Sequence, residues 1–386
     1  MNYRELGKTG LKVSEVGFGA EWMERHGLED VIEVVKECEK QGINLMDVWM
    51  SEPKVRTNLG IAIKDSREKW YIQGHIGSTW QGGQYVRTRD PGQVKAAFED
   101  LLTRLQTDYI DLGMIHYVDR QEDWDGIQNS PFLDYVKELK AAGTIRHIGL
   151  STHNPEIGIQ AAESGFVEMI LFSVNPAFDM LPATDNIDTY FAESFDENLA
   201  GIDPVRAKLY QVCESNGVGI TVMKGFAGGR LFDPKRSPFG VALTPVQCLH
   251  YCLTRPAVSS VMVGYDTPEH VRAAAAYETA TEEEKDYASV LAGAPMHSYQ
   301  GQCTYCGHCK PCPLDIDIAM VNKLYDLAVM QPQVPPSLRE HHNGLAHNAH
   351  HCIGCGACVR SCKMDVRHTG DHECINCAKC MSVCNK

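Results

Sequence analysis

The sequence predicts an α/β protein: a (β/α)8 barrel of the TIM type, followed by a small C-terminal domain that metal organises. Three observations predict it. Short apolar runs alternate with helical patterns from about residue 15 to 292, as in repeated β-α units. Eight such runs can be counted, which is the number of strands in this barrel. Twelve of the 16 cysteines lie beyond residue 300.

The eight apolar runs are the expected barrel strands. They cover residues 16–20, 44–48, 70–75, 110–116, 145–151, 169–174, 219–224 and 258–264. Between them lie amphipathic stretches, one of which repeats apolar residues at helical spacing from Val94 to Leu105. A doubly wound sheet is the alternative, but no G-x-G-x-x-G follows the first strand. We therefore expect a barrel over residues 1–296 and a second domain over 297–386.

Composition and charge restrict the class of protein. Hydrophobic residues make up 44% of the 386 and charged ones 22%, as in a globular protein with a core. The net charge of −14 argues against a nucleic-acid partner, while an acidic surface suits docking to a basic redox partner protein. Residues 1–14 are polar, unlike a signal peptide, and no run is apolar enough to span a membrane. We expect a cytoplasmic protein with a small-molecule substrate and no membrane partner.

The cysteines fall into two groups. The early ones, Cys38, Cys213, Cys248 and Cys252, are expected in the core, where thiols act as small apolar groups. The late ones form three quartets: Cys303, Cys306, Cys309 and Cys312; Cys352, Cys355, Cys358 and Cys362; Cys374, Cys377, Cys380 and Cys384. Because the cytosol keeps thiols reduced, metal ligation is favoured over disulfides.

The spacing within the quartets favours iron–sulfur clusters over zinc. The second and third quartets read C-x2-C-x2-C-x3-C, and the first has one residue fewer before its last cysteine. Zinc sites generally use separated C-x2-C pairs, so a third cysteine in register favours a cluster. In paired ferredoxins the fourth cysteine of one motif ligates the other cluster, so the assignment of cysteines to clusters stays open. We expect at least two [4Fe–4S] clusters, and the twelve thiols suffice for three.

Several motifs along the first 290 residues match one enzyme family. They are YRELGKTGLKVSEVGFGA at 3–20, GINLMDVWM at 42–50, TDYIDLGMIH at 107–116, GTIRHIGLS at 143–151 and MKGFAGGRL at 223–231. On these motifs the chain resembles the aldo-keto reductase family. Its cysteine-rich segment resembles the ferredoxin-like [4Fe–4S] extension of a bacterial branch of that family. The resemblance implies an oxidoreductase barrel, here from an anaerobe, with an N-terminal hairpin closing its floor.

The resemblance also implies a catalytic group of aspartate, tyrosine, lysine and histidine at the ends of adjacent strands. The family pattern D-T-A-x-x-Y-G-x-S-E-x-x-x-G can be laid on the chain from Asp47, which puts Glu52 at the tyrosine position. The lysine strand, laid on 67–77, puts His75 at the lysine position. Asp47 and His116 match their counterparts. The predicted catalytic residues are therefore Asp47, Glu52, His75 and His116.

This exchange changes the proton chemistry. The family's tyrosine, with a reference pKa near 10, becomes a usable acid beside the lysine ammonium. A glutamate is ionised at neutral pH unless its surroundings raise its pKa, so a histidine is the more natural proton donor. We predict a relay in which Asp47 holds His75 charged and Glu52 binds a polar substrate group. The alternatives are a metal ion on Glu52, His75 and His116, and a site that has lost its activity.

Signals for a nicotinamide cofactor are incomplete. The family holds the carboxamide with Ser-Asn and a glutamine, where this chain has Ser151, Thr152 and Leu171. A Gly-rich turn after the seventh strand suits pyrophosphate, because glycine lets backbone amides approach phosphate closely. The residues predicted to bind the cofactor are Ser151, Lys224, Gly225, Gly228, Gly229, Arg230 and Gly264. NADP(H) is an open cofactor, and a glycine turn without a ligand is the alternative.

The expected function is an iron–sulfur oxidoreductase that reduces or oxidises a small carbonyl or unsaturated substrate. Its donor would be NAD(P)H or reduced [4Fe–4S]. The alternative function is a non-catalytic electron-transfer protein or subunit that uses the barrel as a scaffold.

Overall fold

The computed structural model describes residues 1–185, 203–292, 294, 309–329 and 336–361. The chain divides into two compact units. The first holds Met1–Trp80, Tyr85–Asp185 and the described residues of Ala200–Pro295. The second holds Gln81–Gln84 and the described residues of Met296–Lys386.

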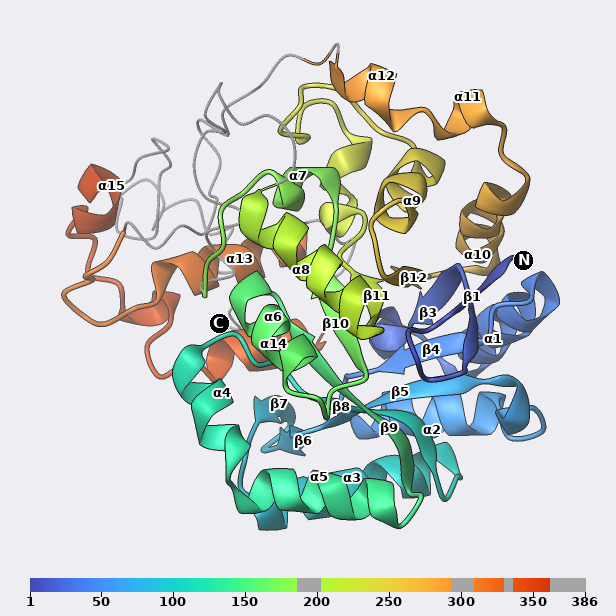
Figure 1. Ribbon diagram of the computed structural model, residues 1–386. Coiled ribbons are helices and arrows are strands. Elements are labelled where there is room, and N and C mark those ends of the chain that lie inside the picture. Colours follow the sequence, from blue (N-terminus) through green and yellow to red (C-terminus); the bar gives the residue numbers. More distant parts are fainter. Residues whose placement is uncertain (186–202, 293, 295–308, 330–335, 362–386) are drawn as a thin grey trace. The chain divides into compact units, whose positions relative to one another are not determined.

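The first unit is a closed barrel of eight parallel strands with helices around it (Figure 1). Its strands are β3 Val16–Gly19, β4 Leu45–Val48, β5 Tyr71–Ile76, β8 Ile110–Ile115, β9 Ile145–Thr152, β10 Met169–Ser173, β11 Gly219–Met223 and β12 Val258–Gly264. They neighbour one another in chain order, and β12 closes the barrel by pairing with β3. The predicted (β/α)8 barrel is thereby confirmed, and each predicted strand end lies within one residue of the observed end.

The helices of the barrel begin in a recurrent way. α3, α5, α6, α8, α9 and α10 each start with proline at the first turn, preceded by a side chain that caps the helix. The capping oxygens satisfy backbone N–H groups at the helix start, and proline supplies a helical φ where its missing N–H does no harm. The ranges are α1 Leu28–Gln41, α2 Pro53–Ala62, α3 Pro91–Leu105, α4 Gln121–Gln128, α5 Pro131–Ala141, α6 Pro155–Glu163, α7 Pro176–Asp179, α8 Pro204–Asn216, α9 Pro245–Leu253, α10 Pro268–Ala275, α11 Glu282–Lys285 and α12 Tyr287–Ala292.

Two apolar cores stabilise the barrel. One lies between the strands and the helices and includes the early cysteines Cys38, Cys213 and Cys252. A smaller one fills the barrel interior and joins Leu45, Leu112, Met114, Met169 and other strand residues to the N-terminal hairpin. That hairpin, β1 Tyr3–Glu5 with β2 Lys12–Ser14, places Leu6 and Val13 in this interior core. Burial of these side chains is the main force that stabilises the fold.

A second hairpin follows β5. It pairs β6 Ser78–Gln81 with β7 Gln84–Arg87 across Gly82 and Gly83, whose φ angles are 59° and 82°. A two-residue turn with positive φ at both positions matches the twist of paired strands, and glycine adopts it without strain. The hairpin thus carries the chain beyond the end of β5 before α3 begins.

The described part of the second unit is small. It contains α13 Ile318–Val329, α14 Pro336–Asn343 and α15 Ala357–Ser361. Its apolar cluster joins Ile316, Ile318 and Val321 to Cys309 and Cys358. No helix among the described residues of either unit is long and apolar enough to cross a membrane.

Candidate active site

Strand register brings three of the predicted catalytic residues together. Asp47 on β4 lies beside Gln73 on β5, and His75 lies beside Met114 on β8. Alternate residues of a barrel strand face the interior, so Gln73 and His75 point to the same side. His116 follows the last residue of β8 and has the same parity as Met114. All of these side chains therefore meet at the carboxyl ends of the strands, where such barrels carry their active sites.

A chain of hydrogen bonds links these side chains. Nε2 of His75 lies 2.9 Å from Oδ1 of Asp47, and its Nδ1 lies 2.7 Å from Nδ1 of His116. The amide of Gln73 donates to the same Asp47 oxygen at 2.7 Å. One carboxylate oxygen thus holds two neighbouring side chains in place. The other nitrogen of His116, Nε2, lies 2.6 Å from the hydroxyl of Tyr85.

The hydrogen-bonded side chains are shielded from water. Asp47, His75 and His116 are 3%, 2% and 6% exposed. Burial lowers the pKa of His116 well below its usual value, and the charges of Arg89 and Arg87 lower it further. The Trp49 ring stacks on His116 with centroids 5.9 Å apart and meets the Tyr85 ring edge-on at 5.3 Å. His116 is therefore neutral in the resting protein.

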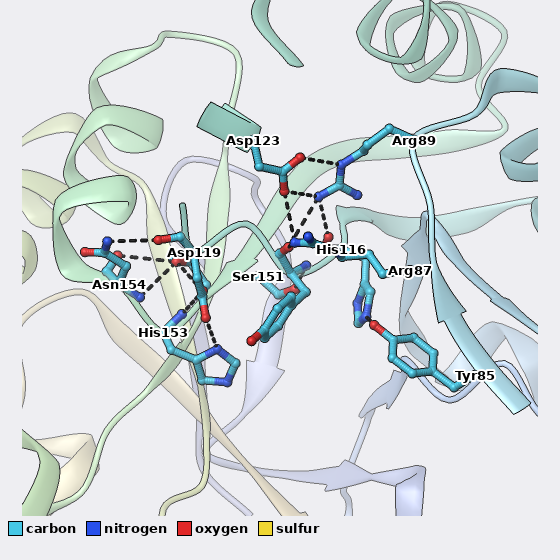
Figure 2. Close-up of polar contacts among 11 residues, drawn as sticks. Tyr85, Arg87, Arg89, His116, Asp119, Asp123, Ser151, His153 and Asn154 are labelled. Carbon is cyan, nitrogen blue, oxygen red and sulfur yellow. Dashed lines mark hydrogen bonds and ion pairs between the residues drawn. The ribbon is translucent and has the colours of Figure 1, made fainter. Parts of the chain in front are cut away.

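Tyr85 and Gln73 were not predicted from the sequence. Tyr85 lies on β7, and its hydroxyl points at the His116 ring (Figure 2). Burial raises the pKa of Tyr85 to about 12, although Arg87 and Arg89 oppose the shift. Two signals were available: the Gly-Gly pair, which favours a hairpin, and a glutamine inside an otherwise apolar strand.

Two arginines fix the backbone that carries His116. Arg89 donates to the carbonyl oxygen of His116 at 2.7 Å and forms an ion pair with Asp123 at 2.9 Å (Figure 2). Arg87 donates to the carbonyl oxygen of Tyr117 at 2.7 Å. Tyr117 has a φ of 51°, which is unusual for a bulky residue and tends to occur at functional sites. The position of His116 is thus fixed from the backbone side as well.

Glu52, predicted at the tyrosine position, lies at the N-cap of α2. The ring nitrogens of His75 and His116 are all engaged by Asp47, by each other and by Tyr85. Neither imidazole therefore has a nitrogen left for Glu52. The structure brings Asp47, His75 and His116 into one hydrogen-bonded chain. The predicted role of Glu52 stays a prediction.

A second buried pair lies at the same end of the barrel. Nδ1 of His153 donates to Oδ2 of Asp119 at 2.8 Å, and Nε2 accepts from the Lys224 ammonium at 2.9 Å. The backbone N–H of His153 donates to Oδ1 of Asp119 at 2.7 Å, and Asn154 donates to the Asp119 carbonyl (Figure 2). Burial raises the pKa of Asp119, but the charge and hydrogen bonds of His153 outweigh it, so the pKa is lowered.

The residues predicted for a nucleotide surround this second pair. Ser151 accepts a hydrogen bond from the backbone N–H of Tyr117 at 2.7 Å. Lys224, with a φ of 61°, opens the turn after β11, and Gly225 follows it. Gly228 and Gly229 have φ angles of 66° and 82°, and a Cβ on either would meet no atom within 4 Å. Arg230 completes the turn, whose backbone is therefore open on one side.

Gly264, the last residue of β12, serves packing. A Cβ built on it would lie 2.2 Å from the Trp22 ring, so only glycine admits that tryptophan. This contact gives Gly264 a role that does not depend on a nucleotide.

Five cysteines of the predicted quartets lie among the described residues. Cys312, Cys352, Cys355 and Cys358 line one cavity, which also borders Ile316 and Ile318. Cys309 is buried beside it in the same apolar cluster. Cys303, Cys306, Cys362, Cys374, Cys377, Cys380 and Cys384 lie outside the described residues. The cavity thus takes one thiol from the first quartet and three from the second.

Known proteins resemble the barrel. A family model described as "Aldo/keto reductase family" matches residues 15–242. The chain is 28% identical over 287 residues to the uncharacterized oxidoreductase YqkF of Bacillus subtilis (strain 168), covering 70% of this chain and 89% of that protein. It is 29% identical over 198 residues to L-galactose dehydrogenase of Arabidopsis thaliana, covering 46% and 60%. The solved structure of aldo-keto reductase AKR11C1 from Bacillus halodurans (holo form) has a TM-score of 0.59 at 22% identity, covering 77% of this chain and 98% of that one, and shows likeness of fold.

Proposed function

Because this chain belongs to the aldo/keto reductase family, we propose that it is an iron–sulfur oxidoreductase that reduces or oxidises a small carbonyl or unsaturated substrate. In this proposal His75 takes the place of the family's lysine, and the tyrosine position, Glu52, binds a polar group of the substrate. The hydrogen-bonded chain from Asp47 through His75 to His116 carries the proposal. It lies at the end of the barrel where this fold places its chemistry.

The hydrogen-bonded chain of Asp47, His75 and His116 is suited to supplying a proton. Reduction of a carbonyl needs two electrons at carbon and an acid that protonates the developing alkoxide. In the proposal His75 holds the proton, with its Nε2 2.9 Å from the Asp47 carboxylate. His116 is kept neutral by its surroundings and can accept a proton from His75 across 2.7 Å. A proton can thus be stored on one histidine and passed through the other.

The geometry favours this relay over a metal ion on the same residues. The Nδ1 atoms of His75 and His116 face each other at 2.7 Å, so they are engaged with each other and have no room for an ion between them. In the described part of the chain, no three His, Cys, Asp or Glu residues are placed to hold a single metal ion. One extra iron or zinc atom beyond the cluster iron, lost in His75→Ala, would overturn the relay.

The cavity in the second unit suits an iron–sulfur cluster. Four thiolates are the ligand set of a [4Fe–4S] cube, and the described candidates are Cys312, Cys352, Cys355 and Cys358, which line one cavity. As they lie in this structure, no three of these described thiols are placed to hold a single metal ion, so the sulfur atoms would have to converge when a cluster binds. The spacing of the quartets, with a third cysteine in register, is the observation that favours a cluster over zinc. When bound, such clusters supply single electrons. The remaining predicted thiols suffice for one or two more.

Iron analysis tests the clusters directly. Anaerobically prepared protein should contain about eight to twelve iron atoms per chain with matching sulfide, at four per cube. Cys312→Ser should lose about four of them, together with one EPR signal of the reduced protein. Cys213→Ala, which removes a buried thiol of the barrel core, should lose none. Fewer than about eight iron atoms in the wild-type protein would contradict the multi-cluster proposal.

The turn Lys224–Arg230 is a candidate for binding a nicotinamide dinucleotide, because Gly228 and Gly229 leave open space beside its backbone, where a pyrophosphate could approach closely. A reduced nicotinamide would supply a hydride. Titration of NADPH and NADH against tryptophan fluorescence tests this donor. No binding at millimolar concentration would remove the hydride mechanism. Protein that holds its clusters but turns over no carbonyl or enone with any donor would instead favour electron transfer on a scaffold.

A further inference from the structure

Tyr85 occupies the outer end of the buried hydrogen-bonded chain. It comes from the β6–β7 hairpin and not from the position at which the family carries its tyrosine. Its hydroxyl lies 2.6 Å from Nε2 of His116, and its ring contacts both Trp49 and His116. The tyrosine is half-buried, whereas the other members of the chain are almost fully covered. It is therefore the member of the chain that a substrate can reach.

The chemistry of the four groups fixes the direction of the chain at rest. A carboxylate only accepts hydrogen bonds, so Nε2–H of His75 donates to Asp47. Neutral His75 then presents a lone pair at Nδ1, which accepts from Nδ1–H of His116. Neutral His116 presents a lone pair at Nε2, which accepts from the Tyr85 hydroxyl. Each donor meets an acceptor. At rest His75 therefore carries its proton on Nε2, and His116 carries its proton on Nδ1.

Adding one proton reverses part of this chain. When His75 becomes an imidazolium, Nε2–H still donates to Asp47, and Nδ1–H now donates to Nδ1 of His116. His116 then carries its proton on Nε2 and donates it to the oxygen of Tyr85. The hydroxyl proton of Tyr85 is thereby released from His116 and turned outward. The charged form thus has a Tyr85 hydroxyl proton that is not engaged by His116, which the resting form does not.

We propose that Tyr85 is the catalytic residue that gives the proton to the substrate, in place of the tyrosine missing at position 52. The inference rests on the proposed function. A reduced nicotinamide, when bound, would supply the hydride for the carbonyl carbon, and the role of Tyr85 is to give its hydroxyl proton to the carbonyl oxygen. Tyr85 recovers a proton from Nε2 of His116, which recovers one from Nδ1 of His75. The substrate gains a hydride and a proton, and His75 ends neutral.

The surroundings of Tyr85 suit this role. Arg87 and Arg89 lie close enough for their charges to oppose the effect of burial on the pKa of Tyr85, so they stabilise a phenolate that forms in passing. Arg89 also binds the carbonyl oxygen of His116, which keeps the imidazole in line with the hydroxyl. The other groups that face the pair are Trp49, His75 and Tyr117.

Removal of one oxygen atom tests the proposal. Tyr85→Phe keeps the ring contacts with Trp49 and should lower kcat for NADPH-dependent reduction of 4-nitrobenzaldehyde or 2-cyclohexenone by about 10²- to 10⁴-fold. KM and iron content should change little. Tyr135→Phe is the matched control. Burial also raises the pKa of Tyr135 to about 12, with Glu99 and Glu138 adding to the shift, and that tyrosine lies on α5, outside the chain.

A conservative variant separates catalysis from packing. Replacement of Tyr85 by 3,5-difluorotyrosine, whose phenol is more acidic, should retain turnover and move the basic limb of the pH–rate profile to lower pH. A tyrosine with only a packing role would leave that limb in place. Turnover of Tyr85→Phe within threefold of an active wild-type protein would overturn this inference alone. A wild-type protein without turnover on either probe would overturn the proposed function, and the role of Tyr85 with it.

Discussion

Two buried aspartate–histidine pairs lie at the mouth of the barrel, and they are held in different ways. Asp47 contacts His75 through side chains alone, and the chain continues through His116 to Tyr85. Asp119 binds both the ring and the backbone N–H of His153, whose other nitrogen meets an ammonium. A histidine can pass a proton only where its second nitrogen meets a group that both takes and gives one. In the first pair His75 meets such a partner, His116, whereas the second nitrogen of His153 meets the Lys224 ammonium.

The largest expected effect separates the pairs by activity. His75→Ala should lower turnover by about 10³-fold or more, because it removes the proton store and breaks the chain between Asp47 and His116. His153→Ala should lower it by less than about tenfold, since His153 ends on Lys224. The measurement is kcat on 4-nitrobenzaldehyde with anaerobically prepared protein, with iron content as the control for the clusters. Equal losses in the two variants would abolish the distinction.

The next effect separates the pairs by stability. Asp119→Asn should lower the free energy of unfolding by about 2–3 kcal/mol, because a buried carboxylate then no longer accepts from a backbone N–H and a ring N–H. Asp47→Asn should lower it by about 1 kcal/mol, since only side chains contact that carboxylate. Urea unfolding followed by tryptophan fluorescence gives both values. A larger loss for Asp47→Asn would contradict the contrast.

The two groups of residues should also differ in how they make the free energy of unfolding depend on pH. His116, in the chain of the first pair, and Asp119, in the second pair, act in different pH ranges. The pKa of His116 is lowered well below its usual value, so below about pH 6.5 the unfolded chain takes up a proton that the folded chain does not. Stability should therefore fall with pH in that range, by up to about 1.4 kcal/mol per pH unit. The pKa of Asp119 is also lowered, so its contribution is present above about pH 3.9 and is lost as the pH falls further.

Two variants separate the pH range in which His116 affects stability from the range in which Asp119 does. His116→Gln should flatten the slope of stability between about pH 6.5 and 5, because it removes the group that titrates there. Asp119→Asn should leave that slope unchanged and alter only the acid limb below about pH 4. Urea unfolding at a series of pH values measures both. An unchanged slope in His116→Gln would mean that His116 is charged in the folded protein.

The smallest expected effect concerns the second pair as part of a nucleotide site. Lys224→Met removes the ammonium that contacts His153 at the start of the glycine turn. We expect the Kd for NADPH to rise about tenfold, which corresponds to about 1.4 kcal/mol, with stability almost unchanged. Lys140→Met on α5 is the control for loss of one positive charge. An unchanged Kd would limit Lys224 to a structural role.

Much of the barrel site could be predicted from the sequence for a simple reason. Strand positions follow from local apolar runs, and parallel strands of a barrel end at one face. Asp47, His75 and His116 each stand at the end of such a run, so their meeting follows from topology. The four early cysteines likewise follow from composition, and all are buried in the core.

Glu52 illustrates the limit of that reasoning. Its place in the family pattern predicts that it lies near the histidines, and in the structure it stands at the N-cap of α2, just beyond the end of β4. The ring nitrogens that it would share are engaged by Asp47, by Tyr85 and by each other. A sequence motif gives the position of a residue along the chain, but the contacts of its side chain depend on the tertiary structure.

The sequence by itself determined the eight-stranded barrel, the strand ends that carry Asp47, His75 and His116, and the three cysteine quartets, because these depend on periodicity and spacing. Only the tertiary structure decided that Tyr85 ends the first chain, that Lys224 ends the second, and that Cys312 shares a cavity with Cys352, Cys355 and Cys358. Each of these contacts joins residues far apart in the chain or on an irregular hairpin. Such pairs are set by the packing of whole elements, which no local pattern of residues encodes.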